Sequence, residues 1–256
     1  MNLHRLAPVS LAPSLLRHSP TARRNGMLEM LDGDPLPGAL PGNLREIRRI
    51  NRGLGWTAVT RRLIERARRE AGLTRTTWSY LDVATGSADL PLAVLRDARR
   101  HGQAVDVHAL DASPAVLREA KSYLRAAPVT LHLGDARALP FEDRAFDIVT
   151  CVLALHHFPR DEAIAVLGEI ARVARHAWLV MDISRGLLAY LGALSLRPLL
   201  RNPMTRHDAP ASVLRAYTVA ELDGMLREAG LSSARLGTYF PFRVAVLGRA
   251  APSGKS

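Results

Sequence analysis

Acidic residues that directly follow apolar runs are the first candidates for chemistry in this chain. In residues 80–91 (YLDVATGSADLP) an apolar run ends at Asp82 and turns through small residues, among them Ala84 and Gly86. A turn of this kind offers a ligand backbone N–H groups and the N-terminus of a helix. Asp111 closes the next apolar run, where a carboxylate can accept hydrogen bonds from both hydroxyls of a ribose.

The spacing of the small residues indicates which nucleotide fits. A dinucleotide fingerprint needs Gly-x-Gly-x-x-Gly, so that a pyrophosphate can approach the backbone. Here the pattern is Ala-x-Gly-x-Ala, with an acid at its start that can organise the loop around a positively charged amino group. Gly134-Asp135-Ala136 follows a third apolar run, where an acid can accept a hydrogen bond from an adenine amino group. The set favours S-adenosylmethionine over NAD, and an NAD-dependent oxidoreductase is the weakest alternative.

Strands and helices that alternate must position these residues. Runs of Val, Ile and Leu between helical patterns predict buried parallel strands. Strands are expected at 79–83, 105–110, 129–133, 146–153 and 177–183, and helices at 89–101, from Ser113, at 161–174 and from Thr218 to Gly230. A hairpin near 233–238 and 242–247 adds an antiparallel strand. The fold class is therefore α/β, with a doubly wound, Rossmann-like sheet of seven strands.

The chain divides into three parts. Residues 1–42, rich in Pro and Gly, are expected to be a flexible extension, and they could also contain an organellar transit peptide or an early start before Met27. Residues 43–77 form a helical cap, and residues 78–250 form the nucleotide-binding domain. An insertion at 184–217 contains the almost wholly apolar GLLAYLGALSLRPLL (186–200), which is too short to span a membrane.

The ordered motifs resemble those of the class I S-adenosylmethionine-dependent methyltransferases, in the group called methyltransferase type 11. The motifs are Asp82 to Gly86, Asp111, Gly134-Asp135, Phe146-Asp147 and Leu155-His156-His157. The segment Asn51-Arg-Gly-Leu-Gly-Trp56 is similar to one in ubiquinone and menaquinone methyltransferases. The stretch 43–51 also looks like a bacterial subgroup of secondary metabolism, often encoded beside type III polyketide synthases.

The resemblance implies S-adenosylmethionine as cofactor and assigns residues to it. The loop would hold the methionine part, Asp111 the ribose, and Asp135 with Ala136 the adenine. The full expected cofactor set is Asn51, Asp82, Ala84, Gly86, Asp111, Ala112, Asp135, Ala136 and Cys151. Glycine is frequent in the family at positions 84 and 88, where this chain has alanines.

Methyl transfer from a sulfonium needs a positioned acceptor and, for a hydroxyl, a group that removes a proton. His156 and His157 follow the fourth strand, beside the expected methyl position, and each could instead pack in the wall or cap a loop. His207, supported by Asp208, and Tyr217 could orient or deprotonate a hydroxyl, or could belong to a plain helix terminus. No metal site is expected.

An apolar insertion over the pocket favours a hydrophobic aromatic, quinol or polyketide-derived acceptor, methylated on oxygen or a ring carbon. The same segment could contact a membrane surface or form a core helix. The net charge of +11 raises a nucleic-acid methyltransferase as an alternative. Only Lys121 and Lys255 are lysines, and the fourth strand leads into Ala-Leu-His-His-Phe, so nucleic acid is disfavoured. A non-catalytic cofactor-binding protein stays open. The single cysteine favours a cytoplasmic location.

Overall fold

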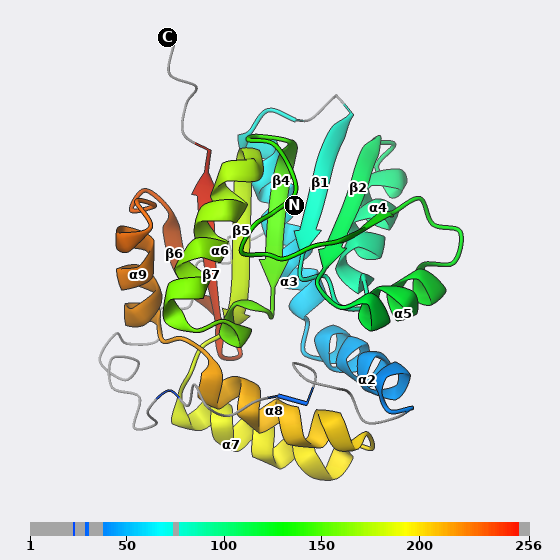
Figure 1. Cartoon of the computed structure of the whole chain (residues 1–256), viewed down its shortest axis with the longest axis vertical. Coiled ribbons are helices and arrows are strands. Elements are labelled where there is room, and N and C mark those ends of the chain that lie inside the picture. The colour runs from blue at the N-terminus through cyan, green and yellow to red at the C-terminus, as the bar shows by residue number, and fades with distance from the viewer. Residues whose placement is uncertain (1–22, 24–28, 31–37, 74–76, 251–256) are drawn as a thin grey trace, which may run out of the picture.

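A seven-stranded sheet forms the centre of the protein (Figure 1). The computed structural model describes residues 23, 29–30, 38–73 and 77–250. The strands are β1 (Trp78–Val83), β2 (Val105–Asp111), β3 (Thr130–Leu133), β4 (Phe146–Val152), β5 (Ala174–Ile183), β6 (Arg235–Tyr239) and β7 (Arg243–Arg249). All but the last residue of β4 is buried, as expected for a Val/Ile-rich strand covered on both faces.

The strand order is β3-β2-β1-β4-β5-β7-β6. The first five strands pair in parallel, and β7 lies antiparallel between β5 and β6. The order reverses between β1 and β4, so a ligand crevice is expected outside the carboxyl ends of these strands. The predicted fold class, including the antiparallel terminal strand, is confirmed.

Helices cover both faces of the sheet. One apolar core cluster joins the sheet to α6 (Arg160–Val173) and α9 (Val219–Glu228), through residues such as Leu167 and Met225. A second cluster joins the opposite face to α3 (Trp56–Glu70) and α4 (Asp89–Arg100), through Ile64 and Leu95. Helix α5 (Pro114–Leu124) packs beside α4 through Leu124. This three-layer arrangement fixes the carboxyl ends of the strands.

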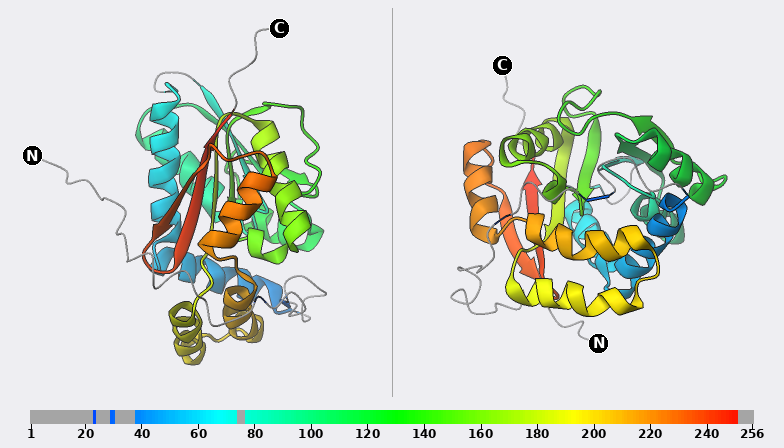
Figure 2. Two further views of the ribbon diagram at one scale, coloured as in Figure 1. Left: turned by 90° about the vertical axis from the view of Figure 1, so that its left-hand side faces the viewer. Right: turned by 60° about the horizontal axis from the view of Figure 1, so that its bottom comes forward.

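Three helices lie across the carboxyl ends of the strands, at the bottom of Figure 1 and in the foreground of the right-hand view of Figure 2. They are α2 (Leu40–Gly53), α7 (Leu187–Leu196) and α8 (Pro203–Arg215), and α8 contacts both of the others. The short helices η1 (Leu155–His157) and η2 (Arg197–Leu199) follow β4 and α7. None of the helices in these described ranges is long and apolar enough to cross a membrane.

Local sequence signals identified most helix starts. Ser113 caps α5 by accepting a hydrogen bond from the Val116 N–H, and Thr218 forms the predicted capping box with Glu221. Strand β5 begins three residues earlier than expected, because α6 runs into it without a turn. Of the extension predicted for 1–42, the structure describes only residues 23, 29–30 and 38–42, and α2 begins at Leu40, three residues before the cap predicted from 43.

Candidate functional site

The turn after β1 has an unusual backbone, because three of its five residues from 84 to 88 are left-handed. Ala84, Gly86 and Ala88 have φ values of 53°, 56° and 55°. Left-handed backbone costs an alanine about 1–2 kcal/mol and a glycine little. A Cβ placed on Gly86 would have no neighbouring atom within 4 Å, so open space lies in front of its backbone. The loop therefore has room for a ligand in front of Gly86.

Asp82 is the buried anchor of this loop. Its carboxylate accepts hydrogen bonds from the hydroxyls of Thr85 (2.7 Å) and Thr150 (2.6 Å), and it is 3% exposed. Burial raises the pKa of Asp82 to about 7, against the lowering effect of these hydroxyls. A positive charge bound in the adjoining cavity would favour the ionised carboxylate.

Asp111, at the end of β2, connects the loop to the next helix. Its two carboxylate oxygens accept hydrogen bonds from the N–H of Gly86 (2.9 Å) and of Ser113 (3.0 Å). Burial raises the pKa of Asp111, while these N–H groups act to lower it. A carboxylate has about four lone-pair sites, so acceptor capacity remains for ribose hydroxyls.

One large cavity, of about 1060 Å³, extends from this loop to the helices at the sheet edge. Cofactor residues predicted from the sequence line it together: Asn51, Asp82, Ala84, Gly86, Asp111, Ala112, Asp135 and Ala136. Cys151 is fully buried in β4 and is not among the lining residues. Asp135 is paired with Arg137 at 2.6 Å, so its carboxylate is shared before any ligand binds. The role of each residue stays a prediction.

At the far end of the cavity the wall formed by α7 is mostly apolar, whereas α8 adds Thr205, Asp208 and Ser212. Small side chains of α7 face inward there, with Ala189 and Ala193 buried, and Val213 of α8 packs with them. Pockets for a single small ligand usually measure roughly 300–1,000 Å³. This cavity lies at the upper end of that range, and it is lined by the cofactor loop at one end and by α7 at the other.

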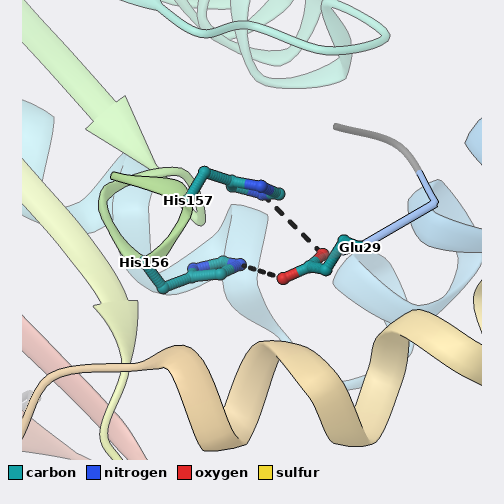
Figure 3. A group of neighbouring side chains, drawn as sticks. All are labelled: Glu29, His156 and His157. Atoms are coloured by element: carbon teal, nitrogen blue, oxygen red, sulfur yellow. Dashed lines mark ion pairs between the residues drawn. The ribbon is translucent and has the colours of Figure 1, made fainter. Parts of the chain in front are cut away.

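His156 and His157 lie in the cavity wall and turn toward Glu29, which comes from the N-terminal segment (Figure 3). Nε2 of His156 is 3.4 Å from one Glu29 oxygen, and Nε2 of His157 is 3.9 Å from the other. On its other side, Nδ1 of His156 meets Asp182 at 2.7 Å. Glu29 and Asp182 are the residues that sequence reasoning missed. Asp182 follows an apolar run at the end of β5, as Asp82 and Asp111 follow theirs, so that signal could have found it, whereas no local motif marks Glu29.

Buried charges determine what each member of this cluster can do. Burial by itself would lower the pKa of His156, but Asp182 and Glu29 outweigh it and raise this pKa to about 10. Burial would raise the pKa of Glu29, but the charge and hydrogen bond of His156 lower it. His156 is thus held as a cation between two carboxylates, a state unsuited to accepting a proton.

Glu29, His156 and His157 offer ligand atoms within 4.8 Å of one another, which is a possible metal-binding arrangement. Arg215 places Nη1 3.8 Å from Glu29, and it donates to the His157 carbonyl at 2.6 Å. Arg23 donates to the carbonyls of Arg215 (2.7 Å) and Phe158 (2.8 Å). Arg215 therefore supplies positive charge beside the Glu29 carboxylate.

His207 and Tyr217, the other two predicted catalytic residues, do not line the cavity. His207 lies in α8 with Nδ1 2.9 Å from Asp208, and its side chain is 40% exposed. The Tyr217 hydroxyl donates to the Phe158 carbonyl at 2.7 Å, and burial is the main cause that raises its pKa to about 12. The structure therefore brings together two of the four candidates, and catalytic roles for all four stay predictions.

Comparison with known proteins decides the family. Residues 81–177, which span the loop, Asp111, Asp135 and the histidine pair, match the family described as "Methyltransferase domain". The chain contains a class I S-adenosylmethionine-dependent methyltransferase domain. The family, enzyme class and cofactor predicted from the sequence are confirmed.

Curated relatives of this methyltransferase domain are demethylmenaquinone methyltransferases. The protein from Shouchella clausii (strain KSM-K16) is 33% identical over 97 residues, which cover 38% of this chain and 40% of that protein. The protein from Bacillus pumilus (strain SAFR-032) is 29% identical over 178 residues, which cover 63% of this chain and 73% of that protein. The chain thus matches about two fifths of the length of the first relative.

Solved structures share the fold. A SAM-dependent methyltransferase from Aquifex aeolicus superposes with a TM-score of 0.51 at 18% identity, over 73% of this chain and 89% of that one. Human N-acetylserotonin methyltransferase in complex with SAM gives a TM-score of 0.59 at 15% identity, over 83% and 56%. At these identities the likeness is one of fold alone.

Proposed function

We propose that this protein transfers a methyl group from S-adenosylmethionine to an oxygen or a ring carbon of a hydrophobic aromatic, quinol or polyketide-derived small molecule. The single observation that carries the proposal is the continuous cavity between the cofactor loop and the apolar wall under α7. The names of the curated relatives, which methylate demethylmenaquinone, support an acceptor of this class.

The chain's own residues fit the cofactor. Open space faces Gly86, the Asp111 oxygens keep acceptor capacity, and Asp82 offers a buried negative charge. When bound, the cofactor supplies an activated methyl on a positively charged sulfur. What remains for the protein is to position the acceptor, exclude water and take up a proton where the acceptor is a hydroxyl.

We assign contact with the acceptor to His157. Its ring packs against His156 with centroids 4.3 Å apart, and its side chain is 21% exposed, compared with 3% for His156. His156 is enclosed between Glu29 and Asp182, so its ring nitrogens are already engaged, whereas the more exposed His157 ring can reach an acceptor in the cavity. Glu29 and His156 then act as positioning residues that orient the His157 ring.

Methyl transfer to a panel of phenols and quinols, followed with labelled S-adenosylmethionine, tests the function. We expect His157→Gln to lower kcat by about 10²–10⁴-fold, the usual contribution of a positioned general base, while affinity for S-adenosylhomocysteine stays close to that of the unchanged protein. His132→Gln, on β3 and away from the cavity, is the matched control. Product formation with none of the panel would refute the acceptor class, and an unchanged kcat in His157→Gln would refute its role.

A further inference from the structure

The exposed apolar side chains of this protein gather on one side of the cavity. Eight large apolar side chains are exposed in the described residues, and seven belong to three segments at the carboxyl edge of the sheet. Those seven are Leu54, Leu187, Leu188, Leu191, Leu199, Phe240 and Phe242, here called the apolar rim. The eighth, Leu133 on β3, lies outside these segments.

Specific contacts join the segments of the apolar rim. A Cβ placed on Gly192 of α7 would lie 3.6 Å from the Phe242 ring, so α7 packs on the β6–β7 turn. The Arg243 guanidinium donates to the carbonyls of both Leu54 and Phe240, which connects the end of α2 to the same turn. The rim is therefore one surface built from three separate parts of the chain.

Helix α7 is apolar on all sides, which is unusual for a helix at the surface. It buries the small residues Ala189 and Ala193 and exposes Leu187, Leu188 and Leu191, at 47%, 68% and 50%. A helix in a soluble protein normally buries its largest apolar residues instead. Exposing the leucines has a hydration cost that a covering apolar phase would remove.

One mouth of the cavity lies within the apolar rim. Leu54 and Phe242 are exposed and also line the cavity, as does Ser195 at the end of α7. A residue that both faces solvent and lines a cavity marks its mouth. A lipophilic molecule that enters there meets the exposed Leu54 and Phe242 side chains before it reaches the chamber under α7.

The charge of the surrounding segment fits an anionic surface. Residues 186–207 contain three arginines and no acidic residue. Arg197, Arg201 and Arg206 are all exposed, and they directly follow the exposed face of α7. An apolar face flanked by cations is the pattern of proteins that lie at the interface of an anionic membrane.

We propose that the apolar rim docks on an anionic lipid surface and that the acceptor enters the cavity directly from that surface. Docking itself does not depend on the activity proposed above, whereas delivery of the acceptor rests on it. The rim residues would lie among the acyl chains just below the headgroups, with Arg197 and Arg201 at the phosphates.

Co-sedimentation of the full chain with vesicles tests the docking. We expect binding to vesicles that contain phosphatidylglycerol, weaker binding to pure phosphatidylcholine, and a loss of binding as salt increases. The triple variant Leu188→Gln/Leu191→Gln/Phe240→Gln should lower the partition coefficient by about tenfold or more. Leu133→Gln, an equally exposed leucine outside the rim, should leave it unchanged. Because all four positions are exposed, folding of each variant is readily checked by thermal unfolding.

Two results would overturn docking on lipid. One is no binding of the unchanged protein to anionic vesicles; a dimer that the triple variant dissociates would then show that a second copy covers the rim. The other is an equal loss of binding in Leu133→Gln.

Delivery has its own readout, in which the triple variant methylates a water-soluble quinol normally but a vesicle-embedded quinol more slowly. Equal rates on both would refute delivery. If vesicles bind but neither quinols nor phenols are methylated, the proposed function fails and the docking stands.

Discussion

Replacing Asp111 by alanine tests the cofactor site most directly. The change removes the acceptor of two backbone N–H groups, at 2.9 Å from Gly86 and 3.0 Å from Ser113, and the partner proposed for the ribose. A hydrogen bond to a charged group contributes roughly 1.5–3 kcal/mol. Since 1.4 kcal/mol corresponds to a factor of ten, each lost ribose bond should weaken binding by roughly tenfold to over a hundredfold.

Two further variants separate binding from folding. Asp111→Asn keeps one carbonyl oxygen for a backbone N–H, so it should lose affinity while the protein unfolds close to the original temperature. Asp111→Ala should lower both the affinity and the unfolding temperature, because the loop and α5 no longer share a hydrogen-bond acceptor. Asp106→Asn, on the same strand with a side chain 65% exposed, is the control and should change neither.

Calorimetric titration with S-adenosylhomocysteine measures the affinity, and thermal unfolding without ligand measures the stability. Unchanged affinity in Asp111→Ala would refute the ribose assignment, whatever the effect on folding. If Asp106→Asn lost the same affinity, the cause would be the loss of a negative charge near the site and not the loss of the Asp111 hydrogen bonds.

The remaining predictions concern stability and the acceptor chamber. Gly248→Ala should lower the free energy of unfolding by about 1–3 kcal/mol or more, because the added methyl overlaps the buried Trp178 indole on β5. Gly168→Ala in α6 should raise the free energy of unfolding by about 0.5–1 kcal/mol, because its added methyl meets no atom within 4 Å. Urea unfolding measures both changes, and changes of the same sign would contradict the packing. The pKa of Asp82 is raised to about 7 in the folded protein, so protonation of Asp82 stabilises the fold below its ordinary pKa of about 4, and this stabilisation is lost as pH rises toward 7. Asp82→Asn should therefore remove the decrease in the free energy of unfolding between about pH 4 and pH 7. An unaltered pH dependence in this variant would mean that another group causes the decrease. Ala193→Leu should fill part of the apolar chamber and lower kcat/KM for bulky acceptors more than for small ones, as a size series of phenols would show; a uniform decrease would place the acceptor elsewhere.

Residues whose role depends on neighbours in sequence were predictable. Asp82 and Asp111 each end an apolar run, and parallel strands place their carboxyl ends at one edge. The residues that line the cavity beside the cofactor loop could therefore be predicted from the sequence. Ala84 and Ala88 departed from the expected glycines, and both accept the left-handed backbone that the turn requires.

The histidine cluster could be predicted only in part. His156 and His157 follow β4 and were found, but Glu29 is 127 positions away in a segment without periodicity. Its carboxylate is 4% exposed because of contacts with residues near 156 and 215, and such long-range burial leaves no local signal. Similarly, α8 forms over residues 203–215 despite Pro210, since its buried face packs against α2 and α7.

The position of β7 has a consequence for how the chain folds during synthesis. The last strand in sequence lies inside the sheet, where it covers the edge of β5 from Ala177 to Ile183 and also holds β6 in place. Until residues 243–249 have left the ribosome, one edge of β5 has unpaired backbone groups, and its side chains, most of which are buried in the folded protein, lie along that open edge. Such edges recruit other chains, so the nascent protein passes through an aggregation-prone stage that ends only with its final strand.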